Sequence, residues 1–372
     1  MKKEIITMQR SNLQFNGQLN PVSTRSRSVI YFVPVKPEFF TKWEYYRCDL
    51  EMLKLAYNDV HVCHKFFEVF KFLFAKHDVF CWWWHLSVPV IVLSRMLGWR
   101  VFCTGAIHMF DCSGAKDFYS KSLIYRLLIR TALHLNNINL FISHDQQLSV
   151  TSHLSTNCPI TIHSSLLPDK ASMLMDQVIE QYKKERSSGL KFLFLCWLTY
   201  EQLRRKGFFI LLEAFSRFVH QTDSTAKLII AGRSGDGLAI IRSTVAQLDI
   251  DANVELRLDL TDSEKSSLYC ESDLFISPSY MEGFGNASLE SMSHGLPAVV
   301  TRYGASHEVV GETGYIINNI DVDSINSVLQ RYFNLGQTAR LSMRMAAFRR
   351  AHDLFGFNTR LTKFEALVSG CN

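Results

Sequence analysis

The chain has 372 residues, of which 47% are hydrophobic and 20% are charged, and its formal net charge is +5. This composition is typical of a globular protein of two to three domains with a sizeable core. Nine cysteines are scattered along the chain without a C-x-x-C pair. The sequence therefore indicates neither a disulfide framework nor a zinc module, and no nucleic-acid-binding motif is present.

Targeting patterns and charge suggest where the protein acts. The residues after Lys2 and Lys3 are too polar for a signal peptide, and the longest apolar region, 79–105, is too interrupted for a membrane span. We expect a cytoplasmic protein with reduced thiols. Residues 1–170 hold 19 lysines and arginines against 12 acidic residues. This basic half indicates either contact with an anionic membrane surface or an unpatterned surface. The aromatic and basic segment 65–76 is the expected contact, with a core helix as the alternative.

The first half alternates between strand and helix patterns, which predicts a parallel sheet. Residues 1–27 are polar and predict a loose lead-in. We expect strands at 28–35, 59–63, 78–84, 99–104, 138–143 and 159–168, and helices at 48–56, 65–76, 88–97, 118–135 and 146–154.

Two groups of reactive side chains in this half have plain explanations. His108 follows a predicted strand, and a lone histidine is more often structural than catalytic. Its spacing from Cys103 and Cys112 fits no tetrahedral metal site. The run Ser143-His144-Asp145 is contiguous in sequence, which is not how a nucleophilic triad assembles. The sequence therefore predicts neither a metal site nor a triad hydrolase here.

The second half repeats the alternation after a polar stretch at 169–189, which we expect to connect two domains. We expect strands at 190–197, 227–232, 253–256, 273–277, 298–301 and 315–317, and helices at 208–219, 263–270, 286–294, 322–353 and 359–367. The near-continuous apolar character of 190–197 is typical of a strand covered on both faces of a parallel sheet.

A basic loop at 199–207 follows the first strand of this half. Arg204, Arg205 and Lys206 precede Gly207, where a helix is expected to begin. Three cations before a helix start are typical of a diphosphate clamp, and a solvated basic turn is the alternative.

The stretch 277–310 is the most informative about function. Gly283 and Gly285 allow the backbone to approach a ligand, and Asn286 is the expected N-cap of the following helix. A helix N-terminus binds an anion or hydroxyl groups through its free N–H groups and partial positive charge.

Two glutamates frame this glycine loop. Glu282 lies within it, and Glu290 lies one turn past Asn286 with its side chain leaning back toward the N-terminus. Both carboxylates are therefore placed to address one ligand. The alternative is that Glu290 only complements the helix dipole, by about 0.3–1 kcal/mol, and that Glu282 is solvated.

The run E-G-F-G-N-A-S-L-E at 282–290, followed by M-S-H-G-L-P-A-V-V, resembles the signature of retaining nucleotide-sugar glycosyltransferases of the group 1 (family 4) type. The resemblance implies an α/β GT-B fold, with two Rossmann-like parallel-sheet domains that face a central cleft. The implied divisions are an acceptor-side domain at 1–168, a connection at 169–189, a donor domain at 190–354, and a terminal helix at 355–372 that crosses back to the first domain. Domain closure on the donor is expected.

The resemblance also implies roles for individual residues. Glu282 and the backbone at 284 and 285 are expected to bind the donor sugar, and Glu290 the ribose. Lys206 with Arg204 or Arg205 is expected to neutralise the diphosphate. The implied catalytic residues are His108, Lys206, Arg205 and Glu282, and the implied donor-binding residues are Arg204, Gly207, Gly283, Phe284, Gly285, Asn286 and Glu290. The loop after residue 35 either contacts the acceptor or packs on its own domain. No metal and no cofactor is expected.

One departure from the family pattern leaves two functions open. The family places an arginine shortly after the strand at 190–197, where Leu198, Thr199 and Tyr200 stand here. The first function is transfer of a sugar, with retention, from a nucleoside-diphosphate sugar to a glycan, lipid-linked or other acceptor in surface polysaccharide or glycoconjugate biosynthesis. The second is a catalytically weak scaffold subunit that binds sugar nucleotides. A sugar-nucleotide epimerase or a phosphorylase matches the pattern less closely. The expected partners are the donor, the acceptor and a membrane surface, with no nucleic acid.

Overall fold

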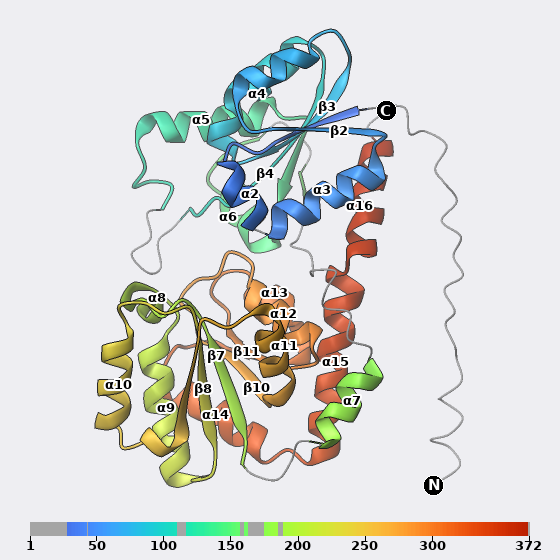
Figure 1. Cartoon of the computed structure of the whole chain (residues 1–372). Helices are drawn as coiled ribbons and strands as arrows, with labels where there is room; N and C mark the ends of the chain where they lie inside the picture. The colour runs from blue at the N-terminus through green and yellow to red at the C-terminus, as the bar shows by residue number, and fades with distance from the viewer. Residues whose placement is uncertain are drawn as a thin grey trace, which may run out of the picture.

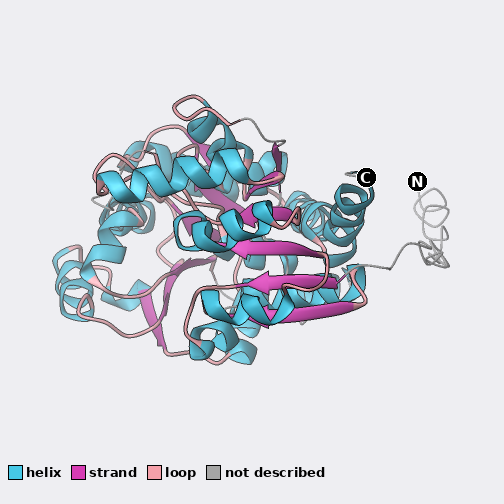
Figure 2. Ribbon diagram, turned by 90° about the horizontal axis from the view of Figure 1, so that it is seen from above, coloured by secondary structure: helices cyan, strands magenta, loops and turns pink. Residues whose placement is uncertain are grey.

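The chain forms two parallel sheets stacked end to end, as the computed structural model shows for residues 28–42, 44–109, 117–156, 160–162, 175–184 and 189–370 (Figure 1). The expected lead-in at 1–27 and much of the expected connection at 169–189 lie outside these residues. Figure 2 shows helices on both sides of the strands. The predicted arrangement of two parallel-sheet α/β domains is confirmed.

The first sheet has the strand order β2-β1-β3-β4-β5-β6. Its strands are β1 (Ser28–Phe32), β2 (Asp59–Cys63), β3 (His77–Trp82), β4 (Arg100–Thr104), β5 (Ile138–Phe141) and β6 (Ile160–Ile162). All six residues of β3 are buried, because helices cover the sheet on both faces.

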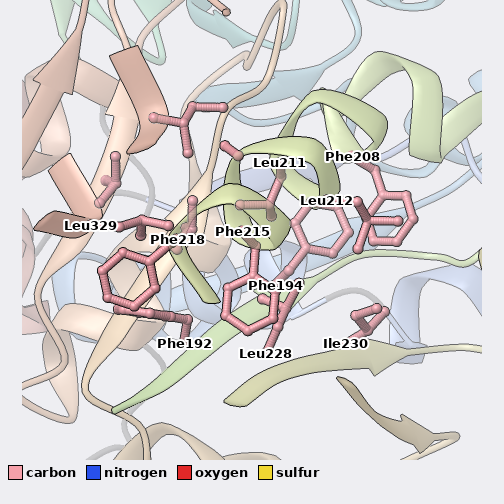
Figure 3. Packing of buried hydrophobic residues seen from close by; sticks show 14 of the residues in the cluster. Phe192, Phe194, Phe208, Leu211, Leu212, Phe215, Phe218, Leu228, Ile230 and Leu329 are labelled. Atoms are coloured by element: carbon pink, nitrogen blue, oxygen red, sulfur yellow. The ribbon is translucent and has the colours of Figure 1, made fainter. Parts of the chain in front are cut away.

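The second sheet has the order β12-β11-β10-β7-β8-β9. Its strands are β7 (Lys191–Leu195), β8 (Lys227–Gly232), β9 (Val254–Leu258), β10 (Leu274–Ser277), β11 (Ala298–Thr301) and β12 (Tyr315–Ile317). Figure 3 shows the apolar side chains of the helix at 208–221 pointing toward β7 and β8. Phe194 and Phe208 have ring centroids 5.1 Å apart, and Phe192 and Phe218 have centroids 5.5 Å apart. An aromatic layer therefore joins this helix to the sheet.

The helices follow the strands in alternation. They are α2 (Pro37–Lys42), α3 (Glu44–Ala56), η1 (Phe66–Phe72, a 3₁₀ helix), α4 (Trp84–Met96), α5 (Leu123–Leu135), α6 (His144–Thr151), α7 (Met175–Lys184), α8 (Tyr200–Arg205), α9 (Phe208–Gln221), α10 (Leu238–Gln247), η2 (Asp251–Asn253), α11 (Asp262–Glu271), α12 (Asn286–Ser293), α13 (Ser306–Val310), η3 (Gly311–Thr313), α14 (Val322–Phe333), α15 (Gln337–Phe355) and α16 (Phe357–Gly370). Within the described ranges, no helix is both long and apolar enough to cross a membrane.

Two segments that the sequence predicted as loops contain short helices. Helix α2 begins at Pro37, whose fixed φ suits the first helical position. Helix α8 begins after Thr199, whose hydroxyl accepts a hydrogen bond from Gln202 N. The predicted basic loop at 199–207 is therefore wrong in form, because a side-chain cap holds a helical turn there.

The last helix, α16, returns to the first domain and packs on α3 (Figure 1). Arg360 on α16 pairs with Asp49 on α3, which is buried and also accepts a hydrogen bond from Trp82 Nε1 at 2.8 Å. Phe364 packs against Phe80 and Phe102 at centroid distances of 5.8 and 5.7 Å. The chain's end thus forms part of the first domain's core.

We predict that Arg360→Met destabilises the protein by about 3–5 kcal/mol, because it leaves the Asp49 carboxylate buried without its ion partner. Urea-induced unfolding measures the change. The control is Arg217→Met, which removes an exposed pair with Asp323 and is expected to cost at most about 1 kcal/mol. Equal losses in the two variants would contradict a structural role for the buried pair.

Candidate active site

The carboxyl ends of the two sheets face each other across a cavity of about 390 Å³. One wall comes from the first domain, with Tyr45, Trp82, Trp83, Ala106, His108 and Ile142. The other comes from the second domain, with Arg205, Lys206 and residues 281–287. Open α/β sheets bind ligands outside the carboxyl ends of their strands. This cavity is therefore the candidate active site.

Glu282 lies on the loop after β10 with its carboxylate at the cavity wall. The carboxylate forms an ion pair with Lys206 Nζ and accepts a hydrogen bond from Ser279 Oγ at 2.8 Å. The second carboxylate oxygen lies 4.0 Å from Arg205 Nη1. Glu282 is thus fixed between two cations.

The junction between α8 and α9 holds these cations against the Glu282 loop. Gly207 has a left-handed φ of 65°, and a Cβ there would collide with the carbonyl oxygen of Pro278. The carbonyl of Arg205 accepts a hydrogen bond from Tyr280 N at 3.0 Å, and its guanidinium donates to Met281 O at 2.9 Å. Only glycine at 207 permits this close approach of the two segments.

The charges around Glu282 determine its protonation. Burial works to raise its pKa, but the positive charges of Lys206 and Arg205 and the hydrogen bond from Ser279 outweigh burial. The pKa of Glu282 therefore lies below its ordinary value of 4.5. The carboxylate is ionised at neutral pH.

Helix α12 begins at the cavity. Its N-cap is Gly285, with a φ of 96°, so the prediction that Asn286 is the N-cap is wrong. A Cβ on Gly285 would lie 2.6 Å from Ser306 Oγ, and the left-handed backbone also disfavours other residues. No side chain caps this helix, so its first N–H groups remain available to an anion or to hydroxyl groups.

His108 lies on the opposite wall and faces the glycine loop. Its Cε1 lies 3.5 Å from the position that a Cβ on Gly283 would take. Loss of solvent contact lowers the pKa of His108, and the positive charge of Arg205 lowers it further. The imidazole is therefore neutral at pH 7.

The cavity brings together most of the residues that the sequence predicted. These are His108, Arg205, Lys206, Glu282, Gly283, Phe284, Gly285 and Asn286. Gly207 lies outside the cavity beneath Pro278, and Arg204 is exposed with its guanidinium 5.9 Å from the centroid of the Tyr200 ring. Arg205, rather than Arg204, is the arginine beside Glu282.

Glu290 lies outside the cavity lining. Its carboxylate pairs with Lys265 Nζ at 2.9 Å and accepts a hydrogen bond from Tyr269 Oη at 3.0 Å. Both partners lie one turn apart on α11, so they hold the carboxylate from the same side. The structure thus places Glu282 in the cavity lining and Glu290 against α11, and the expectation that both address one ligand stays a prediction.

Trp82 and Trp83 on the aromatic wall were not predicted as site residues, whereas Tyr45 lies in the segment after residue 35 that was expected either to contact the acceptor or to pack on its own domain. Trp83 has a left-handed φ of 66°, a strained state that costs about 1–3 kcal/mol and is typical of functional positions. Its Nε1 donates a hydrogen bond to Tyr46 Oη at 2.6 Å, and the Tyr45 and Trp82 rings are 5.0 Å apart. The sequence signal was the run of three tryptophans at 82–84, at the carboxyl end of a strand.

Glu308 connects the two domains directly. Its carboxylate accepts hydrogen bonds from the backbone N–H groups of His144 at 2.9 Å and Asp145 at 2.5 Å, at the start of α6. Ser143 caps the same helix, accepting from Gln146 N at 3.1 Å. The Ser143-His144-Asp145 run is therefore a helix start that receives a carboxylate from the other domain.

The arginine that the family pattern places after β7 has no direct equivalent here. Trp197 is 62% exposed at this point, and the guanidinium carbon of Arg233 lies 5.6 Å from the centroid of its ring. Leu198 N donates a hydrogen bond to Arg233 O at 2.9 Å, which ties the loops after β7 and β8 together. The guanidinium of Arg233, from the loop after β8, therefore lies near the segment where the family pattern has an arginine.

Residues 189–334 match the family model described as glycosyl transferases group 1. The O-antigen chain mannosyltransferase B of Escherichia coli is 30% identical over 33% of this chain and 32% of that protein. The capsular polysaccharide biosynthesis glycosyltransferase CapM of Staphylococcus aureus is 26% identical over 67% of this chain and 64% of that protein. The second domain of this chain, over residues 189–334, is therefore similar to the group 1 glycosyltransferases. Both matches span less than two thirds of these relatives' own lengths.

The fold comparison extends over both domains. The crystal structure of HepE from Anabaena, in complex with UDP, superposes with a TM-score of 0.70 and 13% identity, covering 92% of this chain and all of that one. The likeness confirms the predicted GT-B fold.

Among the described residues, no three or more His, Cys, Asp or Glu side chains group to hold a metal ion. The two D-x-D sequences, at 249–251 and 321–323, are not part of the cavity lining, and the Asp321 side chain caps α14. The polar side chains on the second-domain wall of the cavity are Glu282, Arg205, Lys206 and Asn286.

We predict that Lys206→Met lowers stability at pH 7 by about 3–5 kcal/mol, because the buried carboxylate loses its ion partner. Since the pKa of Glu282 is depressed in the folded state, its ionisation stabilises the protein above pH 4.5, and this contribution is lost as the pH falls further. The variant should lose less stability than the wild type on acidification below pH 4.5. Urea unfolding across this range measures both effects.

The matched control is Lys191→Met, which removes a partly exposed pair with Glu271 at 3.9 Å. Its expected cost is at most about 1 kcal/mol, and its pH profile should follow that of the wild type. A parallel pH profile for Lys206→Met and wild type would contradict the coupling of Glu282 to Lys206.

Proposed function

We propose that the protein is a retaining glycosyltransferase that moves a sugar from a nucleoside-diphosphate sugar to a glycan, lipid-linked or other acceptor. The observation that carries this proposal is the group of Glu282, Lys206 and Arg205 at a glycine loop and helix start, facing His108 across one cavity. The names of the mannosyltransferase and capsular polysaccharide relatives support sugar transfer in surface polysaccharide biosynthesis. The UDP complex of HepE supports a nucleotide donor. We place the reaction in the cytoplasm.

The proposed chemistry requires stabilisation of a departing diphosphate while positive charge develops on the sugar. Arg205 and Lys206 are positioned to neutralise the diphosphate, aided by the free N–H groups at the start of α12. Glu282 and the backbone at 284 and 285 would bind sugar hydroxyls. Binding of a donor would therefore weaken the Lys206–Glu282 ion pair, because both side chains would gain new partners on the donor. Retention follows from the family resemblance, and NMR of the product's anomeric proton tests it.

His108 would contact the donor sugar from the first domain. Because its pKa is lowered, the imidazole is neutral at pH 7 and offers one hydrogen-bond donor and one acceptor. Neither an ionised nor a metal-bound histidine is required in this role. The work of the site is positional and electrostatic, without a divalent cation. Unchanged activity in the presence of EDTA is the expected result.

Glu290 would bind the nucleotide ribose after release from Lys265 and Tyr269. Arg233, beside Trp197, is a candidate for the cation that the family supplies from the loop after β7. Arg204 and Gly207 would support donor binding indirectly. Gly207 would do so through the close approach to Pro278 that it permits.

We assign the acceptor to the aromatic wall of the cavity. The rings of Tyr45, Trp82 and Trp83 oppose the polar wall, and Trp83 retains a strained backbone while its indole donates to Tyr46. Aromatic faces bury the apolar face of a ring or an aliphatic chain, and the remaining indole and phenol groups supply polar contacts. A glycan or lipid-linked acceptor fits this chemistry.

A sugar-nucleotide-binding scaffold is the second candidate. The observation that favours it is the exposed Trp197 near the position where the family has a cation. The two functions separate in one experiment, since a scaffold binds the nucleotide without transfer.

We predict that at least one of the UDP, GDP and ADP sugars raises the melting temperature of the wild-type protein and is turned over. Binding to the native state raises stability by about 2.7 kcal/mol when the ligand is at a hundred times its dissociation constant. A thermal-shift panel followed by detection of released nucleotide measures both steps. A shift without turnover supports the scaffold, and no shift with any donor contradicts both functions.

We predict that Glu282→Ala and Lys206→Ala each lower turnover by roughly a hundredfold or more, because each removes a charge from the reacting centre. The matched controls are Glu271→Ala and Lys191→Ala, a glutamate and a lysine on the same domain outside the cavity. Nucleotide release by all four variants is compared at saturating donor. Equal activity in the cavity variants and the controls would count against the assigned roles.

We predict that Trp83→Leu lowers transfer to the acceptor while slow hydrolysis of the donor continues, since the substitution alters only the aromatic wall. Tyr303→Leu, an exposed aromatic outside the cavity, is the control. Product analysis separates transferred from hydrolysed sugar. Parallel losses of transfer and hydrolysis would place Trp83 with the donor instead.

A further inference from the structure

The 3₁₀ helix η1 and the turn after it expose several phenylalanines. Phe67 is 62% exposed and Phe74 is fully exposed, and Phe70 is also exposed. The Phe66 and Phe70 rings lie against each other with centroids 5.2 Å apart. Several exposed phenylalanines within one short segment of a folded protein indicate an interaction site.

The segment is anchored, so these rings face outward from a fixed backbone. Val69 is buried in the core beside α4. The Glu68 carboxylate accepts hydrogen bonds from His64 N at 2.7 Å and Lys65 N at 3.1 Å. The Phe72 ring stacks on His61 at 4.4 Å. One side of η1 therefore belongs to the domain core, and the other presents phenylalanines to solvent.

Lysines accompany the phenylalanines on this surface. Lys65, Lys71 and Lys76 are all exposed, and Lys65 Nζ lies 5.6 Å from the centroid of the Phe67 ring. The acidic residue of the segment, Glu68, is held by the backbone N–H groups before η1. Aromatic rings combined with lysines are the composition of segments that bind anionic lipid surfaces.

Exposed apolar side chains also occur on α5, which packs on α4. Packing joins η1 to α4 and α4 to α5. Leu123 and Ile124, in the first turn of α5, are 74% and 71% exposed. Among the described residues, fifteen exposed large hydrophobic side chains belong to the first domain and five to the second. Figure 1 shows α4 and α5 on the side of the first domain away from the second.

We propose that Phe67, Phe70, Phe74, Lys65, Lys71 and Lys76, which we name the η1 face, bind the surface of a bilayer that contains anionic phospholipids. A two-fold dimer through this face would bring two copies of the same lysine-bearing surface together. Repulsion between these like charges disfavours a second copy as the occupant. Charge complementarity with anionic headgroups favours the lipid. The proposal does not depend on the transferase activity.

The test is co-sedimentation of the full chain with phosphatidylcholine vesicles, prepared with and without phosphatidylglycerol. One variant is Phe67→Ser/Phe70→Ser/Phe74→Ser, and a second is Lys65→Gln/Lys71→Gln/Lys76→Gln. The control is Leu55→Ser/Ile240→Ser/Leu354→Ser, which removes exposed apolar side chains from α3, α10 and α15. Circular dichroism establishes that each variant is folded.

The wild type and the control should sediment with vesicles that contain phosphatidylglycerol, and less so in high salt. The lysine variant should bind these vesicles roughly a hundredfold more weakly, at about fivefold for each lysine. The phenylalanine variant should lose roughly tenfold or more on both lipid compositions. Donor-induced thermal shifts are measured in parallel, so that a failure of the proposed function is recognised separately.

Three outcomes would overturn the proposal. The wild type would remain in the supernatant with phosphatidylglycerol vesicles, or the phenylalanine variant would sediment as well as the wild type. In the third, light scattering without lipid would show a wild-type dimer that the phenylalanine substitutions convert to a monomer, which would assign the η1 face to contact between two copies.

Discussion

The ion pair between Lys206 and Glu282 determines the geometry of the polar wall. The two residues follow β7 and β10, the two central strands of the second sheet, so the pair lies beyond the carboxyl ends of neighbouring strands. A buried carboxylate and a buried ammonium are tolerated only together, because either alone carries a large desolvation cost. Three features hold Lys206 close to Glu282. They are the left-handed backbone of Gly207, its contact with Pro278, and the hydrogen bonds between Arg205 and the Glu282 loop.

The two walls of the cavity divide the chemistry between the domains. The second domain provides fixed charge and backbone N–H groups, and the first provides aromatic surface and a neutral histidine. Glu308 links the walls, because its carboxylate occupies the N–H groups at the start of α6. Any opening of the cleft must break these hydrogen bonds. The relative position of the domains is therefore set by contacts beside the site, as well as by the last helix.

The sequence predicted the fold well because buried parallel strands are continuous apolar runs, as at 191–195, and the glycine loop marks its site locally. Its errors have local physical causes. Asn286 is the better capping residue by type, but Gly285 takes the cap because only glycine fits beside Ser306. The aromatic wall joins Tyr45 to Trp82 and Trp83 through tertiary packing, which no short motif encodes. Lys265 and Tyr269, which hold Glu290, lie on a separate helix, so no short motif encodes this contact either.

The buried Asp49 carboxylate connects the last helix of the chain to the cavity wall. One carboxylate oxygen receives Arg360 of α16, and the other receives the indole of Trp82, which lines the cavity. Because α16 follows directly from α15 of the second domain, the Arg360 pair ties the end of that domain to α3 of the first. The last helix and the aromatic wall of the cavity are therefore joined at one buried carboxylate.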